Sequence, residues 1–169
     1  MNLYAENMKY IQNHMDEKTE YHKEFEYHPA QLLYEFRFVN LNYGRQTGKS
    51  RGIAEFMAHE KIKNPKRDII LTSYRAAMWD DIKRNYRNHC LEYGLVPTKN
   101  PMFTSFGGNL AKRAVNNGTW WNQFRGLNLI DPIFIFDEPM DIDPRAFLDK
   151  FVNSCHYTGL PTFYIIGSQ

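Results

Sequence analysis

The residues best suited to chemistry lie in the short segment 43–50, which reads Tyr-Gly-Arg-Gln-Thr-Gly-Lys-Ser. The segment follows an apolar run at 36–41 and precedes Ile53, Phe56 and Met57, whose spacing is typical of a buried helix face. This order predicts a strand, a loop and a helix. Backbone amides at the start of a helix are unpaired donors at the positive end of its dipole, and they bind anions. The segment therefore predicts a loop that holds the phosphates of a nucleotide.

Three positions of the predicted loop have separate roles. Gly48 would let the backbone close around the β-phosphate, Lys49 would reach the β- and γ-phosphates, and Ser50 would bind Mg²⁺. The usual pattern is G-x-x-x-x-G-K-[ST], whereas here Tyr43 stands in the place of the first glycine and Gly44 follows one residue late. The alternative interpretation is an ordinary glycine-containing turn followed by a surface lysine.

A second pattern is the acidic end of another apolar run. Residues 133–138 read Ile-Phe-Ile-Phe-Asp-Glu, as expected of a buried central strand whose last residues enter a polar site. Asp137 could hold Mg²⁺, and Glu138 could orient and deprotonate an attacking water. A glutamate directly after the metal-binding aspartate favours hydrolysis over phosphoryl transfer to a small molecule. The alternative is an ordinary strand that runs into an acidic turn.

The elements that must position these residues alternate between helix and strand. We expect an N-terminal helical extension over 1–26, a short helix at 29–34, and strands at 36–41, 69–72, 133–138 and 162–166. Further helices are expected after residue 50, from Trp79 to Gly94, and from Asp143 and Pro144 to a stop at Gly159 and Pro161. A hairpin is expected at 114–121, whose Trp120 and Trp121 would lie in the core by default, with a subunit contact or a DNA-facing wedge as alternatives. This alternation predicts an α/β fold with a mostly parallel sheet, in which ligands bind beyond the carboxyl ends of the strands.

Composition narrows the class of protein. The 169 residues are 43% hydrophobic, which is enough for one substantial core. Cys90 and Cys155 are predicted to be small core hydrophobes rather than disulfide partners. No apolar run reaches about 18 residues and no export signal is evident, so we expect neither membrane spanning nor secretion.

Charge gives little indication of a nucleic-acid partner, because the formal net charge is only +2. Any contact with nucleic acid would depend on local basic clusters. One cluster comprises Lys61, Lys63, Lys66 and Arg67, and the other comprises Lys83, Arg84 and Arg87. Each cluster is either a solvated face or a surface that grips phosphates.

Segments in both halves of the chain resemble the ATPase domain of the large terminase subunits of tailed bacteriophages. The Arg-Gln-Thr-Gly-Lys-Ser segment at 45–50 is similar to their deviant phosphate loop, in which the leading glycine is often missing. The later segments follow in the family's order. They are the strand at 68–73, the Phe-Arg-Gly at 124–126, the acidic strand at 133–138, and the final strand with its coupling motif at 162–169. The resemblance covers about residues 27–169. The terminal Gly-Ser-Gln departs from the ending of many relatives.

The resemblance implies a three-layer P-loop NTPase fold (ASCE type), with residues 27–169 as the ATPase domain and no nuclease domain in this chain. It implies hydrolysis of ATP with Mg²⁺ that powers the movement of double-stranded DNA into a procapsid. The implied partners are double-stranded DNA, a portal protein, a small terminase subunit and further copies of the chain in a ring, commonly a pentamer. The implied compartment is the host cytoplasm.

The resemblance also assigns residues. The nucleotide-binding loop would be Gly44, Arg45, Gln46, Thr47, Gly48, Lys49 and Ser50, with Ser50 and Asp137 as metal ligands and Glu138, Lys49 and Arg45 as catalytic residues. Arg45 would stabilise charge on the transferring phosphate. Gln31 occupies the place of an adenine-reading glutamine, and an exposed glutamine at a helix start is the alternative. Ser168 and Gln169 would form the coupling motif, and Arg125 or Arg113 would be presented to a neighbouring subunit.

Two other functions remain open at this point. One is a helicase-like ATPase that nucleic acid stimulates. The other is a nucleotide-binding or docking module that does not turn over, in which replacement of Glu138 would leave every activity unchanged.

Overall fold

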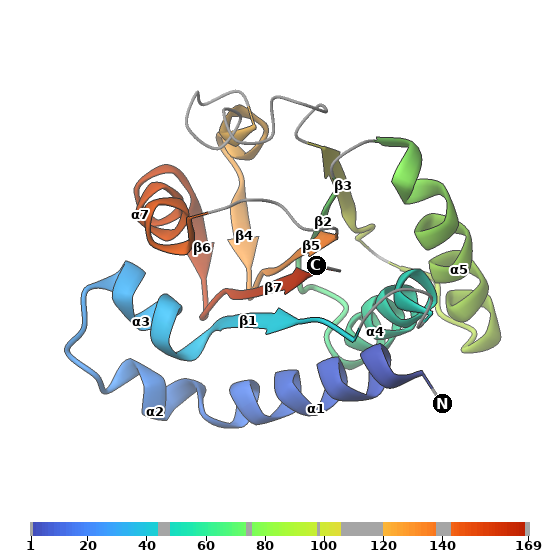
Figure 1. Cartoon of the computed structure of the whole chain (residues 1–169), viewed down its shortest axis with the longest axis horizontal. Coiled ribbons are helices and arrows are strands. Elements are labelled where there is room, and N and C mark those ends of the chain that lie inside the picture. Colours follow the sequence, from blue (N-terminus) through green and yellow to red (C-terminus); the bar gives the residue numbers. More distant parts are fainter. Residues whose placement is uncertain are drawn as a thin grey trace.

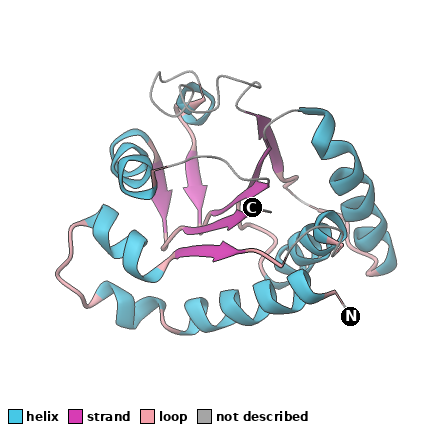
Figure 2. Ribbon diagram, viewed as in Figure 1, coloured by secondary structure: helices cyan, strands magenta, loops and turns pink. Residues whose placement is uncertain are grey.

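The computed structural model describes residues 2–43, 48–73, 76–97, 99–105, 120–137 and 143–167. The helices of this part are α1 (Leu3–Glu17), α2 (Thr19–Lys23), α3 (Pro29–Phe36), α4 (Lys49–Lys63), α5 (Trp79–Glu92) and α7 (Pro144–Ser154), with 3-10 helices η1 (Ala76–Met78) and η3 (Trp121–Phe124). The strands are β1 (Phe38–Leu41), β2 (Ile69–Ser73), β3 (Met102–Ser105), β4 (Asn128–Ile130), β5 (Ile133–Asp137), β6 (His156–Thr158) and β7 (Thr162–Ile166). Figure 2 shows how helices surround the strands.

A five-stranded sheet in the order β1-β7-β5-β2-β3 forms the centre of the fold, and all its described pairs are parallel. Helices cover both faces (Figure 1). The core on one face joins α1, α4 and α5 to the sheet, and the core on the other joins α3, η3 and α7 to it. The prediction of an α/β fold with a mostly parallel sheet between helical layers is confirmed.

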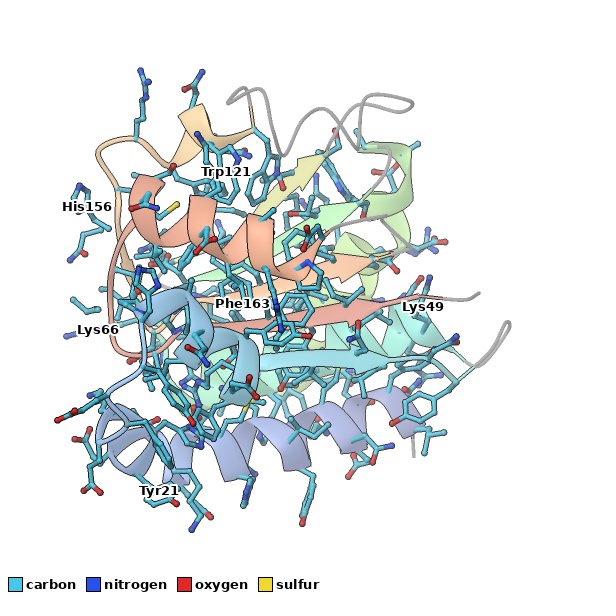
Figure 3. The ribbon with its side chains drawn as sticks, turned by 60° about the vertical axis from the view of Figure 1, so that its left-hand side comes forward. Tyr21, Lys49, Lys66, Trp121, His156 and Phe163 are labelled. Carbon is cyan, nitrogen blue, oxygen red and sulfur yellow. The ribbon has the colours of Figure 1, made fainter. Side chains whose placement is uncertain are left out.

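Strand β5 illustrates why this sheet is buried on both faces. Ile133 and Ile135 belong to the core under α4, whereas Phe134 and Phe136 belong to the core under α7. Alternate residues of a strand point to opposite faces, so an unbroken apolar run suits a strand that is covered on both sides. Phe163 of β7 packs among the aromatic rings of the α7 side, at the centre of Figure 3.

The N-terminal segment forms two helices rather than one, because the backbone at Lys18 leaves the helical conformation (φ −95°, ψ 6°). Helix α1 packs on α4 and on the sheet, with Tyr4 and Met8 fully buried in the core of that face. Helix α1 is therefore part of the layer that covers the sheet.

Two sequence predictions need correction, and one strand was not predicted. Trp120 lies in a turn and Trp121 begins η3, so this end of the predicted hairpin is not a strand, although both rings are buried as expected. Helix α7 ends at Ser154 rather than near Gly159, because the chain turns extended at Cys155 and pairs β6 with β4. The segment before η3 also contains β3, an edge strand that the sequence patterns did not indicate.

The two cysteines are free and buried, as predicted. Burial raises the pKa of the Cys155 thiol to about 12 and raises the pKa of Cys90. Neither thiol is therefore suited to nucleophilic chemistry at neutral pH.

Candidate nucleotide-binding site

The two sequence patterns meet in space. Lys49 is the first residue of α4 and Asp137 is the last residue of β5, and Lys49 Nζ lies 2.9 Å from Asp137 Oδ1. The side chains are 17% and 4% exposed, so water screens this pair only weakly. Strand β7 lies between β1, which leads toward α4, and β5. The lysine therefore reaches the aspartate across an intervening strand.

The start of α4 has a backbone conformation and side-chain charges that would suit an anion. Gly48 is its N-cap, with the left-handed backbone conformation (φ 73°) that glycine adopts readily. Glycine has no side chain that could accept from the first amides of the helix, whereas Asp143 caps α7 in that way. The first turn of α4 contains Lys49 and Arg51 and no acidic residue. Positive side chains are unfavourable at the positive end of a helix dipole, and a bound anion would reverse that cost.

Polar residues end three neighbouring strands, β5, β2 and β3, at the same edge of the sheet. The last residues of the five strands are in register, in the order Leu41, Ile166, Asp137, Ser73 and Ser105. Alternation along each strand directs Asp137 and Ser73 to the face that α4 covers. The Ser73 hydroxyl is buried and makes no hydrogen bond in the described part of the chain. Carboxylate and hydroxyl oxygens are ligands that suit Mg²⁺.

These residues lie at the edge of the sheet that is formed by the carboxyl ends of its parallel strands. Figure 3 shows Lys49 at the end toward which the arrows of β1 and β7 are directed, opposite Lys66. The chain also leaves β7 at this edge, since the Gly167 N–H donates to the Leu41 carbonyl at 3.2 Å. In open parallel sheets ligands bind at this edge.

Several predicted site residues fall outside the described part of the chain. These are Gly44, Arg45, Gln46, Thr47, Arg113, Glu138, Ser168 and Gln169. Their assigned roles remain predictions. Ser50 lies in the first turn of α4 beside Lys49, as expected, and is half-buried.

Gln31 lies in a different environment from Lys49. It is exposed on α3, which lies beside α7 at the opposite end of β1 from α4 (Figure 1). It lines a cavity of about 400 Å³ with His28, Tyr34, Arg145 and Asp149, where the Arg145 guanidinium stacks over the Tyr34 ring. The described contacts thus group Gln31 with α7 rather than with the start of α4, and an adenine-reading role stays a prediction.

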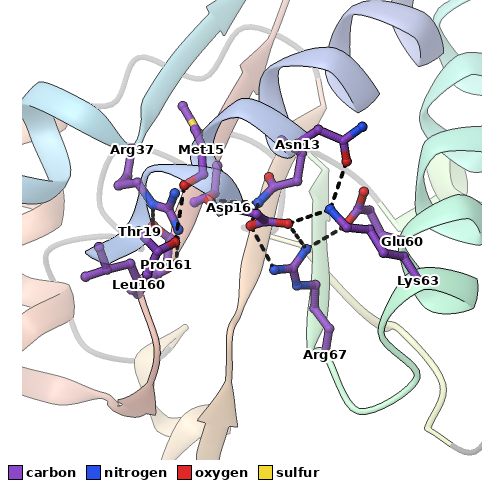
Figure 4. Close-up of polar contacts among 12 residues, drawn as sticks. Asn13, Met15, Asp16, Thr19, Arg37, Glu60, Lys63, Arg67, Leu160 and Pro161 are labelled. Atoms are coloured by element: carbon purple, nitrogen blue, oxygen red, sulfur yellow. Dashed lines mark hydrogen bonds and ion pairs between the residues drawn. The ribbon is translucent and has the colours of Figure 1, made fainter. Parts of the chain in front are cut away.

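The first basic cluster is largely structural. Lys61 and Arg67 are buried, and Lys61 donates to the Arg67 carbonyl. Arg67 pairs with Asp16 of α1 and with the fully buried Glu60, and Lys63 also pairs with Asp16 (Figure 4). Neither a solvated face nor a DNA-gripping surface describes the buried Lys61 and Arg67, so both interpretations were wrong for these two residues. Lys63 and Lys66 are exposed, and both interpretations stay open for them. The cluster also joins α1, α4 and the turn before β2.

The second basic cluster and Arg125 are more open. Lys83 lies over the rings of Trp79 and Phe103, and Arg84 pairs with Asp81 on the helix surface. Arg125 follows η3 and is exposed. An exposed arginine has the accessibility that contact with a neighbouring subunit requires, and that contact stays a prediction.

The residues that the structure describes contain no group of three or more His, Cys, Asp or Glu side chains that could hold a metal ion. Within these residues, no helix has both the length and the apolar character that crossing a bilayer demands.

Sequence reasoning missed two features of the site. Ser73 gave no signal because a serine at a strand end is common, and only the register places it beside Asp137. The contribution of α1, described below, was also missed.

Comparisons with protein-family models, curated proteins and solved structures found no match.

Proposed function

We propose that this protein is a Mg²⁺-dependent ATPase with a P-loop type of phosphate site. The observation that carries the proposal is the 2.9 Å pair between Lys49 and Asp137, because it unites the two sequence patterns at the carboxyl edge of a parallel sheet. An ordinary turn with a surface lysine would leave that lysine in water. A strand that merely runs into an acidic turn would not have its aspartate against the start of a helix.

In this proposal the Lys49–Asp137 pair is the nucleotide-free arrangement. An incoming triphosphate brings about four negative charges, which compete with one carboxylate for the ammonium group. Lys49 would turn to the β- and γ-phosphates, while the amides at the start of α4 donate to the β-phosphate. Asp137 would then be available to the metal ion.

Asp137 and Ser50 are the residues we assign to Mg²⁺, with Ser73 close to Asp137 in register. When bound, this ion supplies positive charge that offsets the charge on the phosphates. Glu138 follows Asp137 directly and would orient and deprotonate the attacking water, and Arg45 would stabilise charge on the γ-phosphate.

The larger role we propose is that of a terminase-like DNA-packaging motor. It rests on the sequence resemblance at residues 45–50 and 133–138 and on the order of the segments between them. In that role several copies of the chain would form a ring on a portal protein in the host cytoplasm. A small terminase subunit and double-stranded DNA would be further partners. Exposed Arg125 is a candidate for the contact between subunits.

The test is steady-state ATP hydrolysis by the purified protein with Mg²⁺, compared with Glu138→Gln, each with and without duplex DNA. We expect turnover in the wild type, a loss of at least about 100-fold in the variant, and stimulation by duplex DNA. Stimulation by single-stranded DNA alone would favour a helicase-like ATPase. Tight nucleotide binding with no turnover in either protein, under both DNA conditions, would favour a binding module and contradict the proposal.

A further inference from the structure

The start of helix α1 contacts both described ends of the predicted phosphate loop. The Tyr43 N–H donates to the Tyr4 hydroxyl oxygen at 3.1 Å, on the side where the chain enters the loop. Asn2 Nδ2 donates to the Gly48 carbonyl oxygen at 2.9 Å, on the side where the chain leaves it. Two residues of one helix start therefore hold the two positions that flank residues 44–47.

The Asn2 side chain is fixed by its own helix. Its Oδ1 accepts from the backbone N–H groups of Tyr4 at 3.1 Å and Ala5 at 3.3 Å, so Asn2 is the N-cap of α1. An amide can accept through its oxygen and donate through its nitrogen at the same time. The cap therefore directs Nδ2 to the Gly48 carbonyl.

Close packing accompanies these hydrogen bonds. The Tyr4 ring is fully buried and meets the Tyr43 ring edge to face, with centroids 4.8 Å apart. At Gly52 in the first turn of α4, an added Cβ would lie 2.2 Å from Asn2 Oδ1 and 2.7 Å from Tyr4 Cβ. The two helix starts thus approach so closely that only glycine fits at position 52.

Further contacts join helix α1 to α4 and to the sheet. Lys9 pairs with Glu55 of α4 at 2.7 Å, and the hydroxyl of buried Tyr164 donates toward Gln12 Oε1 at 3.0 Å. Farther along, Asp16 pairs with Arg67. A group that positions a binding site acts best when its own element is fixed in this way.

We propose that Asn2 and Tyr4 are positioning residues that hold the phosphate loop ready for nucleotide, an inference that rests on the proposed function. It gives a reason for Tyr43 in the place of the first glycine of the usual pattern. The tyrosine offers α1 a ring to pack against, and its amide is held by a side-chain hydroxyl. The N-terminal helix thereby contributes to phosphate binding without a contact to the phosphates.

The experiment measures the Kd for Mg-ATP and the thermal unfolding midpoint of variants of this chain. Tyr4→Phe removes only the hydroxyl, and Asn2→Ser keeps a helix cap but cannot span the gap to the Gly48 carbonyl. We expect each variant to bind about three- to tenfold more weakly, because a site held by fewer hydrogen bonds must be ordered on binding. The matched control is Tyr164→Phe, which also removes a buried hydroxyl bonded to α1, away from the loop. It should lower the unfolding midpoint and leave Kd unchanged.

If Tyr4→Phe and Asn2→Ser both bind Mg-ATP with the same Kd as the wild type, the inference is overturned and the ATPase proposal stays intact. Absence of Mg-ATP binding by the wild type would instead contradict the ATPase proposal. In that event amide hydrogen exchange decides the positioning role. Exchange at the Tyr43 amide should be faster in Tyr4→Phe than in Tyr164→Phe, and equal rates would overturn it.

Discussion

Ser73 and Asp137 are direct neighbours in register on β2 and β5, and both side chains are directed to the face that α4 covers. The Ser73 hydroxyl is fully buried and has no hydrogen-bond partner within the described ranges. A buried hydroxyl without a partner costs free energy, and this one lies beside the aspartate that the proposed function assigns to Mg²⁺.

Replacement of this hydroxyl tests whether it serves the site. Mg²⁺ should increase the affinity of the wild type for nucleotide. We expect this increase to be about three- to tenfold smaller in Ser73→Ala, with the unfolding midpoint nearly unchanged. Thr72→Val is the matched control, because Thr72 points to the opposite face and its hydroxyl bonds to Thr104 at 2.7 Å. It should lower the free energy of unfolding by about 1 kcal/mol without changing binding. Identical Mg²⁺ titrations for Ser73→Ala and the wild type would argue against a role for Ser73.

The Arg67 network predicts a large effect on stability. Arg67→Met would leave Asp16 and the fully buried Glu60 without their shared partner. We expect the free energy of unfolding, measured by urea denaturation, to fall by about 3 kcal/mol. Adding Glu60→Gln should restore part of the loss, because it removes the buried charge.

The control for this network is the exposed pair Arg84–Asp81. Arg84→Met should change the free energy of unfolding by no more than about 0.5 kcal/mol. An equally small change in the free energy of unfolding for Arg67→Met would mean that its buried ion pairs contribute little to stability.

His22 predicts a dependence of stability on pH. Burial, together with the positive charges of Arg37, His14 and Lys18, lowers its pKa below the ordinary value of 6.5. The unfolded chain then binds a proton more readily than the folded one, so the histidine contributes stability above pH 6.5 that is lost as the pH falls through the folded pKa. Urea denaturation between pH 7.5 and about 5 measures this loss.

The comparison variant is His22→Phe. It preserves a ring that can stack on Phe36, as the imidazole does at 4.7 Å, and it cannot titrate. We expect its stability to fall less over the same pH range than that of the wild type. Parallel curves for the two proteins would exclude His22 as a source of the dependence.

The sequence was sufficient to predict the elements with strong local signals. The apolar run before Asp137 became β5, the Asp143-Pro144 pair started α7, and the strand at 162–166 has the predicted bounds. Strands β4 and β6 have three residues each, which is too short for a periodic pattern, and their pairing depends on contacts between distant segments.

The site could be predicted only in part, for a similar reason. Two motifs in the local sequence predicted that Lys49 and Asp137 belong to one site, and the structure adds that their side chains pair at 2.9 Å. The roles of Asn2, Tyr4 and Ser73 depend on where α1 and β2 lie in the fold, and their residue types alone give no such signal. Arg67 shows that a local pattern can also mislead. It belongs to a basic cluster in the sequence, but in the fold it is buried and pairs with two carboxylates from other parts of the chain.

The most direct measurement is the calorimetric affinity of Mg-ATP for the wild type and for Lys49→Ala, with Lys66→Ala as the control. Lys66 is exposed and lies on the opposite side of the molecule (Figure 3). A phosphate site that depends on Lys49 predicts binding by the wild type and by Lys66→Ala, and a loss of at least about 100-fold in Lys49→Ala, as expected when a charge-assisted contact to phosphate is removed. Equal affinity in all three proteins, or no binding by the wild type, would contradict the assignment of the phosphate loop.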